Sequence, residues 1–209
     1  PIYNLNKQVI GFGGRVLDAS LPKYLNSPET PVYHKSKSLY GLHLARNKCR
    51  ETRTIYIVEG YFDLLALHQY GVENAGATLG TALTTDHIHM IKGFAEKVIL
   101  VFDGDDAGIQ ASLRSVGIFI EKGMQARVML LPKGHDPDSF IRKSGLEAFE
   151  TVAAKSRSVI TFIMESAQKK FGLSVEGKMR ILDELKKPLA SIEDRTAREA
   201  YIKEVSEYL

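Results

Sequence analysis

The sequence of 209 residues has little cysteine and no long apolar run, and both absences narrow the class of protein it can encode. With Cys49 alone, it has no internal disulfide and no multi-cysteine zinc site, so a reducing, cytoplasmic compartment is the default expectation. The longest apolar stretches have the length of strands, which excludes a membrane span. The 44% hydrophobic and 25% charged residues are typical of an ordinary globular protein.

Two further features are missing near the amino terminus. Pro1-Ile-Tyr-Asn has neither an initiating methionine nor a basic-then-apolar signal, so we expect the chain to be a piece of something longer. Gly11-Phe-Gly13-Gly14 is followed by no predicted helix, whereas a dinucleotide-binding loop needs a strand before it and a helix after it. We therefore reject a dinucleotide site.

Charge is present but unevenly distributed. Residues 1–50 carry eight Lys and Arg against two acids, a net charge of +6, whereas residues 51–150 carry nine against fourteen, a net charge of −5. Residues 151–209 carry eleven against nine, a net charge of +2. A solvated surface explains charge alone, but a basic arm ahead of an acidic centre also suits a polyanion that binds along one surface and reacts at the other.

The hydrophobic pattern predicts alternating strands and helices in the middle of the chain. Strands are expected at 54–58, 74–78, 97–102 and 126–131. Helices are expected between them at about 61–70, from Thr84 or Thr85 past Ile91, and at about 106–122. Strands separated by helices predict βαβ units and a parallel sheet.

The flanks of this core follow different patterns. A glycine-punctuated β segment is expected at 9–17, a loop at 20–30 and a helix at 38–50. Beyond Asp138 no convincing strand remains, and Gly145, Gly172 and Pro188 are expected to separate the helices. These helices are predicted at 139–143, 146–155, 159–171, 175–187 and 194–208. The chain is expected to divide into an N-terminal β and loop segment (1–51), an α/β core (52–140) and a helical subdomain (141–209).

Three acidic clusters follow predicted strands of the core. Their members are Glu59, Asp103 with Asp105, and Asp136 with Asp138. Because the carboxyl ends of parallel strands open onto a common crevice, we expect these carboxylates to lie close together. They would repel one another unless cations lay between them, and hard divalent cations such as Mg²⁺ take oxygen ligands and share phosphates. The clusters therefore predict a metal-dependent, phosphate-handling site.

Each acid also has a simpler interpretation. Glu59 alone is a common helix N-terminal acid, and Asp63 is expected to be a first-turn acid or a support for the metal ligands. Asp106 is expected to cap the following helix. Asp136-Pro-Asp138 is ordinary turn and helix-start chemistry, and it gains weight only from its position after the next strand. The Asp103-Gly-Asp105 pair is the sharper signal, since Gly104 allows a tight turn between two carboxylates.

The basic arm contains candidate nucleic-acid contacts. Loop Lys, Arg and Asn residues near an aromatic suit phosphate contacts and base stacking, although each alone is a common surface residue. The candidates are Arg15, Lys23, Asn26 and Lys35. His87 and His89 do not face each other at i,i+2 on a helix, so no histidine is assigned to the site.

Several motifs together resemble a known family. Ile57-Val-Glu-Gly-Tyr-Phe-Asp63, Leu79-Gly-Thr81, Asp103-Gly-Asp-Asp-Ala-Gly108 and Asp136-Pro-Asp138 resemble the TOPRIM core shared by topoisomerases and primases. Gly11-Phe-Gly-Gly-Arg-Val-Leu17, Pro22-Lys-Tyr-Leu-Asn-Ser-Pro-Glu-Thr30 and Leu39-Tyr-Gly41 are similar to the bacterial replicative DNA primases, the DnaG family. The motifs cover about residues 9–140, and the flanking ones are the more specific.

The resemblance implies a fold and a reaction. The fold would be a TOPRIM-type, mostly parallel sheet with flanking helices, between a small β and loop segment and a helical subdomain. The reaction would be synthesis of short RNA primers on single-stranded DNA, in which a primer 3′-hydroxyl attacks the α-phosphate of an NTP and releases pyrophosphate.

The resemblance also implies roles for individual residues. Glu59, Asp103 and Asp105 would be catalytic, and Asp63 would support the metal ligands. More than one Mg²⁺ or Mn²⁺ ion would be held by Glu59, Asp103, Asp105, Asp136 and Asp138. The nucleotide and the DNA would contact Arg15, Lys23, Asn26 and Lys35.

Some parts of the family's proteins are expected to be absent from this chain. There is no cysteine set for the family's zinc-binding domain, so no zinc is expected here. The first part of the polymerase domain and the C-terminal helicase-binding module are also expected to lie elsewhere. Contacts with the replicative helicase and the single-strand-binding protein would then use absent parts, and the fragment is expected to be weakly active or inactive alone.

Three other interpretations stay open at this point. One is another TOPRIM enzyme, a nuclease or a topoisomerase relative, although a type IA topoisomerase needs a tyrosine in a separate large domain. The second is a receiver-like signalling domain, for which the order of residues fits badly. The third is a non-catalytic nucleic-acid-binding module whose carboxylates are structural.

Overall fold

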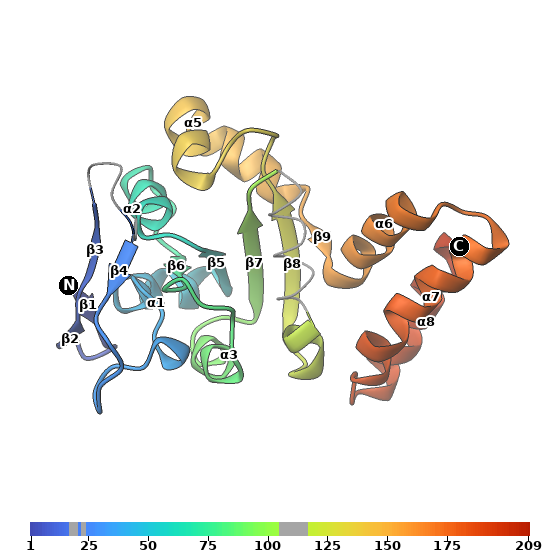
Figure 1. Cartoon of the computed structure of the whole chain (residues 1–209), viewed down its shortest axis with the longest axis horizontal. Helices are drawn as coiled ribbons and strands as arrows, with labels where there is room; N and C mark the ends of the chain where they lie inside the picture. The colour runs from blue at the N-terminus through green and yellow to red at the C-terminus, as the bar shows by residue number, and fades with distance from the viewer. Residues whose placement is uncertain (17–20, 22–23, 105–116) are drawn as a thin grey trace.

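The structure, a computed structural model, describes residues 1–16, 21, 24–104 and 117–209. Figure 1 shows three parts side by side: small β ribbons at the N-terminal end, a central sheet with helices on both faces, and a helical tail that ends at the C-terminus. Within the described residues no helix is long and apolar enough to cross a membrane.

The central sheet has five strands in the order β6-β5-β7-β8-β9. Their bounds are Thr54–Val58 for β5, Ala75–Ala77 for β6, Lys97–Phe102 for β7, Gln125–Leu130 for β8 and Arg157–Ser158 for β9. β5 pairs in parallel with β6 and β7, and β7 pairs in parallel with β8. The predicted α/β fold with a mostly parallel sheet is therefore confirmed.

The apolar runs of β7 explain why this strand lies at the centre of the sheet. Alternate side chains point to opposite faces of a strand, so Val98, Leu100 and Phe102 join one hydrophobic core while Ile99 and Val101 join the other. One core includes residues of α1 (Leu42–Thr52), α3 (Thr85–Lys92) and α6 (Val159–Phe171). The other includes residues of α2 (Tyr61–Gln69) and α5 (Pro137–Ala154). Both faces of the sheet are thus covered, as a parallel sheet requires.

The N-terminal part consists of two antiparallel ribbons. β1 (Ile2–Tyr3) pairs with β2 (Val9–Gly11), and β3 (Gly13–Arg15) pairs with β4 (Tyr24–Asn26). A short 3₁₀ helix, η1 (Lys35–Lys37), follows them. The helix predicted from residue 38 begins only at Leu42, because the left-handed Gly41 lies at its N-cap.

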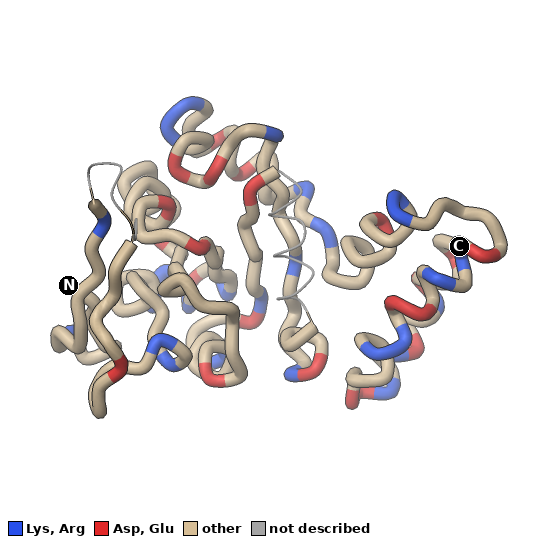
Figure 2. Tube along the Cα trace, in the orientation of Figure 1, with Lys and Arg blue, Asp and Glu red and all other residues tan. Residues whose placement is uncertain are grey.

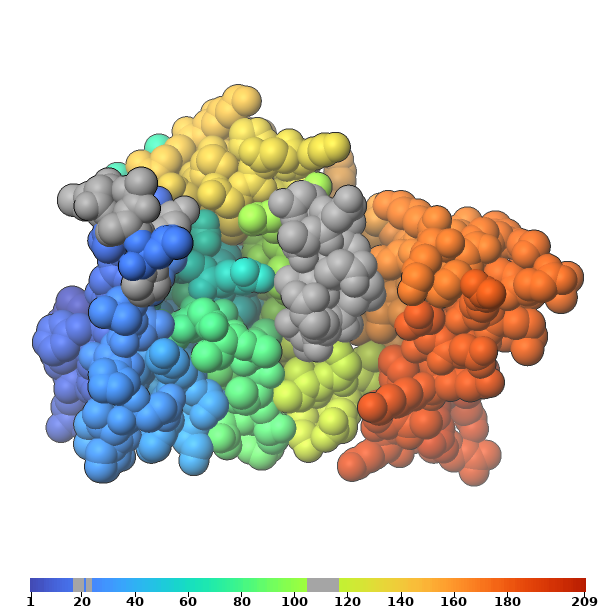
Figure 3. Space-filling view, viewed as in Figure 1, coloured from blue at the N-terminus to red at the C-terminus, as the bar shows by residue number. Residues whose placement is uncertain are grey.

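The helical tail consists of α6, α7 (Val175–Ala190) and α8 (Arg195–Tyr208). Gly177 lets α7 approach the end of α6, since a Cβ there would lie 2.6 Å from the Phe171 carbonyl oxygen. A hollow of about 590 Å³ lies where residues 119–126 meet the start of α8. Figure 3 shows this tail beside the sheet domain on one face of the molecule.

Three expectations for the C-terminal half are wrong. A two-residue strand, β9, lies after Asp138 and pairs antiparallel with β8. Two residues are too few to show a strand pattern in the sequence, so this strand was not predicted. Pro188 lies inside α7 rather than ending it. The helices predicted on either side of Gly145 are joined as α5 across a kink at this glycine, where φ is 78°. The predicted helix at 106–122 lies partly outside the described residues, and residues 117–121 are helical.

Candidate active site

Glu59 and Asp103 lie at neighbouring positions on the carboxyl edge of the sheet. Glu59 directly follows β5 and Asp103 directly follows β7, and the two strands pair in parallel with Ile57 opposite Leu100. Both side chains are exposed. The parallel register therefore brings two of the predicted carboxylates to one crevice, as expected for strands whose carboxyl ends share an edge.

Asp63 links the N-termini of two helices beside this crevice. It occupies the third position of α2, where its two carboxylate oxygens accept hydrogen bonds from the backbone N–H groups of Gly60 (3.1 Å) and Asp138 (3.3 Å). The second bond joins α2 to the first turn of α5, 75 residues along the chain. Asp63 thus holds the segment after β5 against the segment after β8.

The pKa of Asp63 is raised by its burial and by neighbouring carboxylates. The pKa of this carboxyl is raised to about 6, chiefly by burial and also by the nearby carboxylates of Asp136 and Asp103, while the two backbone hydrogen bonds oppose the rise. A charged group taken from water and placed near like charges binds a proton more readily. Asp103 and Asp136 thus lie near enough to Asp63 to act on its charge, while the predicted gathering of the carboxylates around a metal stays a prediction.

Asp136 and Asp138 both take part in the start of α5. Asp136 is the N-cap residue, and its Oδ1 accepts a hydrogen bond from the Ser139 N–H at 2.8 Å. Partial burial raises the pKa of Asp136, but hydrogen bonds from Ser139 outweigh this effect and the pKa is lowered. Asp138 forms an ion pair with Arg142 one turn later. Their predicted role as metal ligands stays a prediction.

The donor chemistry of the crevice suits a hard cation, although the described ligand set is incomplete. Glu59 and Asp103 offer carboxylate oxygens, which Mg²⁺ and Mn²⁺ prefer. Within the described ranges, however, no three His, Cys, Asp or Glu side chains lie close enough to hold a metal ion. Asp105 and Asp106 lie outside the described residues, so their predicted roles as ligand and helix cap remain predictions.

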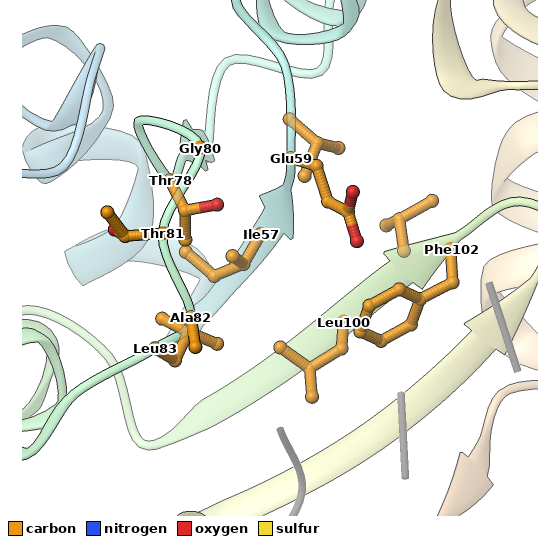
Figure 4. Close-up of a pocket in the computed structure, with 11 residues that line it drawn as sticks. Ile57, Glu59, Thr78, Gly80, Thr81, Ala82, Leu83, Leu100 and Phe102 are labelled. Atoms are coloured by element: carbon orange, nitrogen blue, oxygen red, sulfur yellow. The ribbon is translucent and has the colours of Figure 1, made fainter. Parts of the chain in front are cut away.

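A hollow of about 330 Å³ opens beside Glu59. Its base consists of apolar side chains of β5 and β7, and its rim includes the loop between β6 and α3. Figure 4 shows the Thr78 hydroxyl and the Glu59 carboxylate directed into this hollow from different sides, with Leu100 and Phe102 below them. Gly80, with φ of 72°, gives the loop its left-handed turn.

Arg15 lies against two aromatic rings next to the acidic centre. Its guanidinium carbon is 5.6 Å from the ring centre of Tyr24 and 5.3 Å from that of Phe62, the residue before Asp63. Such cation–π contacts hold a guanidinium in place while leaving its N–H donors available. The Arg15 guanidinium is thus held against β4 and the start of α2, while its contact with a nucleotide or DNA remains a prediction.

Asn26 has a structural role that the sequence did not reveal. Its side-chain amide donates a hydrogen bond to the Leu79 carbonyl (2.9 Å), and its amide oxygen accepts one from the Tyr61 hydroxyl. Both ends of the amide are therefore engaged within the protein, between β4, the loop after β6 and the start of α2. The close approach of Tyr61 to β3 also needs Gly13, since a Cβ there would lie 2.3 Å from the Tyr61 hydroxyl.

Of the two remaining predicted basic contacts, the structure describes Lys35 but not Lys23. Lys35 lies in η1, where its carbonyl is bonded to the buried His87 ring at 3.0 Å and its side chain is partly exposed. His87 thus holds η1 against α3, in keeping with a structural histidine. Lys23 lies outside the described residues.

The sequence reasoning missed the side chains that position these groups. Tyr61, Phe62 and Thr78 stand within or next to the motifs, but nothing in their spacing shows that they contact β3, β4 or the hollow. Figure 2 shows a second aspect of the charge pattern: Lys and Arg alternate with Asp and Glu along α7 and α8, while the central strands are largely uncharged.

Three family models match successive parts of the chain. Residues 1–46 match the N-terminal domain of the DNA primase catalytic core, and residues 56–141 match a Toprim-like domain. Residues 160–209 match the DnaB-helicase binding domain of primase. The last match corrects the expectation that a helicase-binding segment lies wholly outside this chain.

Known proteins resemble the chain over almost its whole length. The DNA primase of Clostridium acetobutylicum is 41% identical over 209 residues, which are 99% of this chain and 35% of that protein. A DNA primase domain from Pseudomonas aeruginosa has a TM-score of 0.92 at 37% identity, with 99% of this chain and 66% of that one covered.

A third similar protein carries a ligand. The DnaG primase catalytic domain bound to single-stranded DNA has a TM-score of 0.88 at 38% identity, with 99% and 68% covered. The chain therefore spans about a third of the length of the curated relatives it matches and about two thirds of the solved catalytic domains.

Proposed function

The chain belongs to the bacterial DnaG primase family, and from that premise we propose that it forms the catalytic part of a primase that makes short RNA primers on single-stranded DNA. A primer 3′-hydroxyl attacks the α-phosphate of an NTP, a new phosphodiester bond forms and pyrophosphate leaves. The observation that carries the proposal is the pairing of Glu59 and Asp103 at the carboxyl ends of two parallel strands, beside the raised pKa of Asp63.

The residues of the crevice have distinct parts in the proposed reaction. Glu59, Asp103 and Asp105 are the catalytic carboxylates, and with Asp136 and Asp138 they would hold Mg²⁺ or Mn²⁺. These ions, when bound, would supply the positive charge that polarises the α-phosphate and lowers the pKa of the attacking hydroxyl. Asp63 accepts a hydrogen bond from the Asp138 backbone N–H group and so holds the backbone at Asp138 in place. Arg15 offers a fixed positive charge to the NTP or the template backbone.

The proposed partners follow from the same membership. The proposed template is single-stranded DNA, to which the catalytic domain of a solved relative is bound, and the proposed substrates are NTPs. We assign the replicative helicase to the helical tail, because residues 160–209 match a helicase-binding domain. Single-strand-binding protein would bind to other parts of the full-length protein. The proposed division into 1–51, 52–140 and 141–209 is supported by the positions of the three family matches.

The proposal is tested in a full-length family member that contains this chain, supplied with labelled NTPs, Mg²⁺ and single-stranded DNA. We expect Asp103→Asn to lower primer yield roughly 10²-fold or more, because a carboxylate that stabilises the reacting charge is lost. Asp183→Asn, which removes a surface carboxylate paired with Lys186 on α7, is the matched control and should leave the yield unchanged.

Two outcomes would overturn the proposal. Unchanged metal binding and primer yield in the Asp103→Asn protein would mean that the carboxylates are structural and the chain is a nucleic-acid-binding module. Cleavage or relaxation of linear or supercoiled DNA without incorporation of NTPs would instead identify another TOPRIM enzyme.

A further inference from the structure

Helix α7 carries two rows of apolar residues, and only one of them is buried in the helical tail. The buried row consists of Gly177, Ile181 and Leu185. A second row, formed by Val175, Met179 and Leu182, has the i, i+4, i+7 spacing of one helix face. Leu182 packs at the edge of the core, whereas Val175 is 75% exposed and Met179 is 55% exposed. The apolar face of α7 is therefore wider than the part that the tail covers.

The exposed row lies at the free end of the tail. Figure 1 shows that α6 leads away from the sheet and that α7 starts at the turn farthest from it. Leu173, one residue before the Ser174 N-cap, adds a third apolar side chain at this turn and is 47% exposed. We call Leu173, Val175 and Met179 the apolar tip. Clustered exposed apolar side chains of this kind mark surfaces that bind another protein.

Positive charge surrounds the apolar tip. Residues 168–180 contain four Lys and Arg against one acid, a net charge of +3. Two of these cations lie against the Phe171 ring, with the Lys170 Nζ 4.6 Å and the Arg180 guanidinium carbon 5.6 Å from the ring centre. The exposed pair of Lys170 with Glu184 (3.6 Å) is of a weak kind that a partner's carboxylate can replace. This surface fits a partner segment that combines apolar and acidic side chains.

The partner that these observations favour is the replicative helicase. Residues 160–209, which match a helicase-binding domain, comprise nearly all of α6 and the whole of α7 and α8, so the apolar tip lies within the matched segment. The apolar residues of α6 are buried in the core that it shares with the sheet, which leaves them no part in docking. A helicase bound at the far end of the tail would also leave the carboxylate crevice open.

We propose that the apolar tip is the surface by which the helical tail binds the replicative helicase. The bound helicase segment presents apolar side chains to Val175 and Met179. Its carboxylates face Lys170 and Arg180. This inference rests on the proposed assignment of the helicase to the tail, and it adds the residues that make the contact and the chemistry of the segment that they bind.

The test measures the affinity of this chain for the purified replicative helicase of the same bacterium. Val175→Asp combined with Met179→Asp should weaken binding roughly tenfold or more, because charges replace apolar contacts at the centre of the interface. Both positions are exposed, so the urea midpoint should move no more than for other surface changes. Ile202→Asp is the matched control, since it places the same charge at a 49% exposed apolar residue of α8 outside the apolar tip and should leave the affinity unchanged.

Two further measurements separate the charge contacts from the apolar ones and locate the partner. Lys170→Gln combined with Arg180→Gln should weaken binding roughly two- to fivefold and make the remaining affinity less sensitive to salt. In a full-length primase that contains this chain, a photo-reactive amino acid in place of Val175 should cross-link to the helicase. The same group in place of Ile202 should not.

Each contrary result has a distinct meaning. Equal affinities of the parent and the Val175→Asp, Met179→Asp protein would overturn the inference and leave the helicase on another face of the tail. Absence of binding by the parent chain would overturn both the inference and the assignment of the helicase to the tail. A cross-link from position 175 to primase itself would show that the apolar tip is covered by primase. NTP incorporation by the full-length protein without helicase is independent of all three results, so failure of this inference is distinguishable from failure of the primase function.

Discussion

At the scale of single residues, the position of Asp103 depends on how closely the ends of β7 and β8 approach each other. Gly104 lies so near β8 that a Cβ there would be 2.0 Å from the Leu131 carbonyl oxygen. The Leu131 N–H also donates to the Phe102 carbonyl at 3.1 Å, which fixes this approach. The absence of a side chain at Gly104 thus sets where the neighbouring carboxylate stands.

Gly104→Ala should therefore destabilise the protein. We expect a loss of about 1 to 3 kcal/mol in the free energy of unfolding, as for other overpacked sites, and weaker Mn²⁺ binding because Asp103 is displaced. Gly117→Ala is the control, since a Cβ at this helical glycine meets no atom within 4 Å. Urea unfolding of both variants measures the effect, and equal midpoints would contradict it.

At the scale of elements, the sequence predicted the strands that carry the carboxylates but not the contacts between helices. Apolar runs such as 97–102 mark strands because both faces are buried. Thr84 or Thr85 was expected to cap the next helix, and Thr84 is the N-cap of α3. By contrast, the bond from Asp138 to Asp63 joins residues 75 positions apart, and no periodicity records it. β9 was missed for the same reason, since a two-residue strand exists only through its partner.

The joint between α2 and α5 at Asp63 should make stability depend on pH. Because the folded-state pKa of Asp63, about 6, lies above the usual value of 3.8, the folded protein binds this proton more tightly than the unfolded chain. The contribution of Asp63 to the free energy of unfolding should then rise as the pH falls from about 6 to about 4. The rise should be on the order of 1 to 3 kcal/mol.

The measurement compares urea midpoints of the parent and Asp63→Asn between pH 7 and pH 4, with EDTA present. The difference between the two proteins isolates the effect of Asp63. The lowered pKa of Asp136 changes the free energy of unfolding only below about pH 3.8. Parallel curves for the two proteins would show that Asp63 titrates like an ordinary carboxyl.

At the scale of the whole molecule, the chain combines the β3-β4 ribbon that carries Arg15, a crevice with carboxylates and a helical tail. It spans about a third of the length of its curated relatives. The order of these parts and the charge asymmetry were readable from the sequence, because composition and motifs are local. The roles of Asn26 and Phe62 were not, because they arise where β3 and β4 meet α2.

We expect the isolated chain to bind Mn²⁺ and NTP but to give little primer on single-stranded DNA. The reason is that the chain spans about a third of its curated relatives and about two thirds of the solved catalytic domain that is bound to single-stranded DNA, so we expect residues outside these 209 to contribute to template binding. Primer yield per mole of protein, compared with that of a full-length relative, measures this. A robust yield from the isolated chain would show that these residues suffice for template handling.

The Asn26 side chain on β4 is hydrogen-bonded to the Leu79 carbonyl and to the Tyr61 hydroxyl, and so connects three segments of the chain at one position. The loop it grips runs on into the hollow beside Glu59, and the helix it grips carries Phe62 and Asp63. Loss of the Asn26 amide would therefore release the β3-β4 ribbon, the loop that lines the hollow and the start of α2 from one another at a single position.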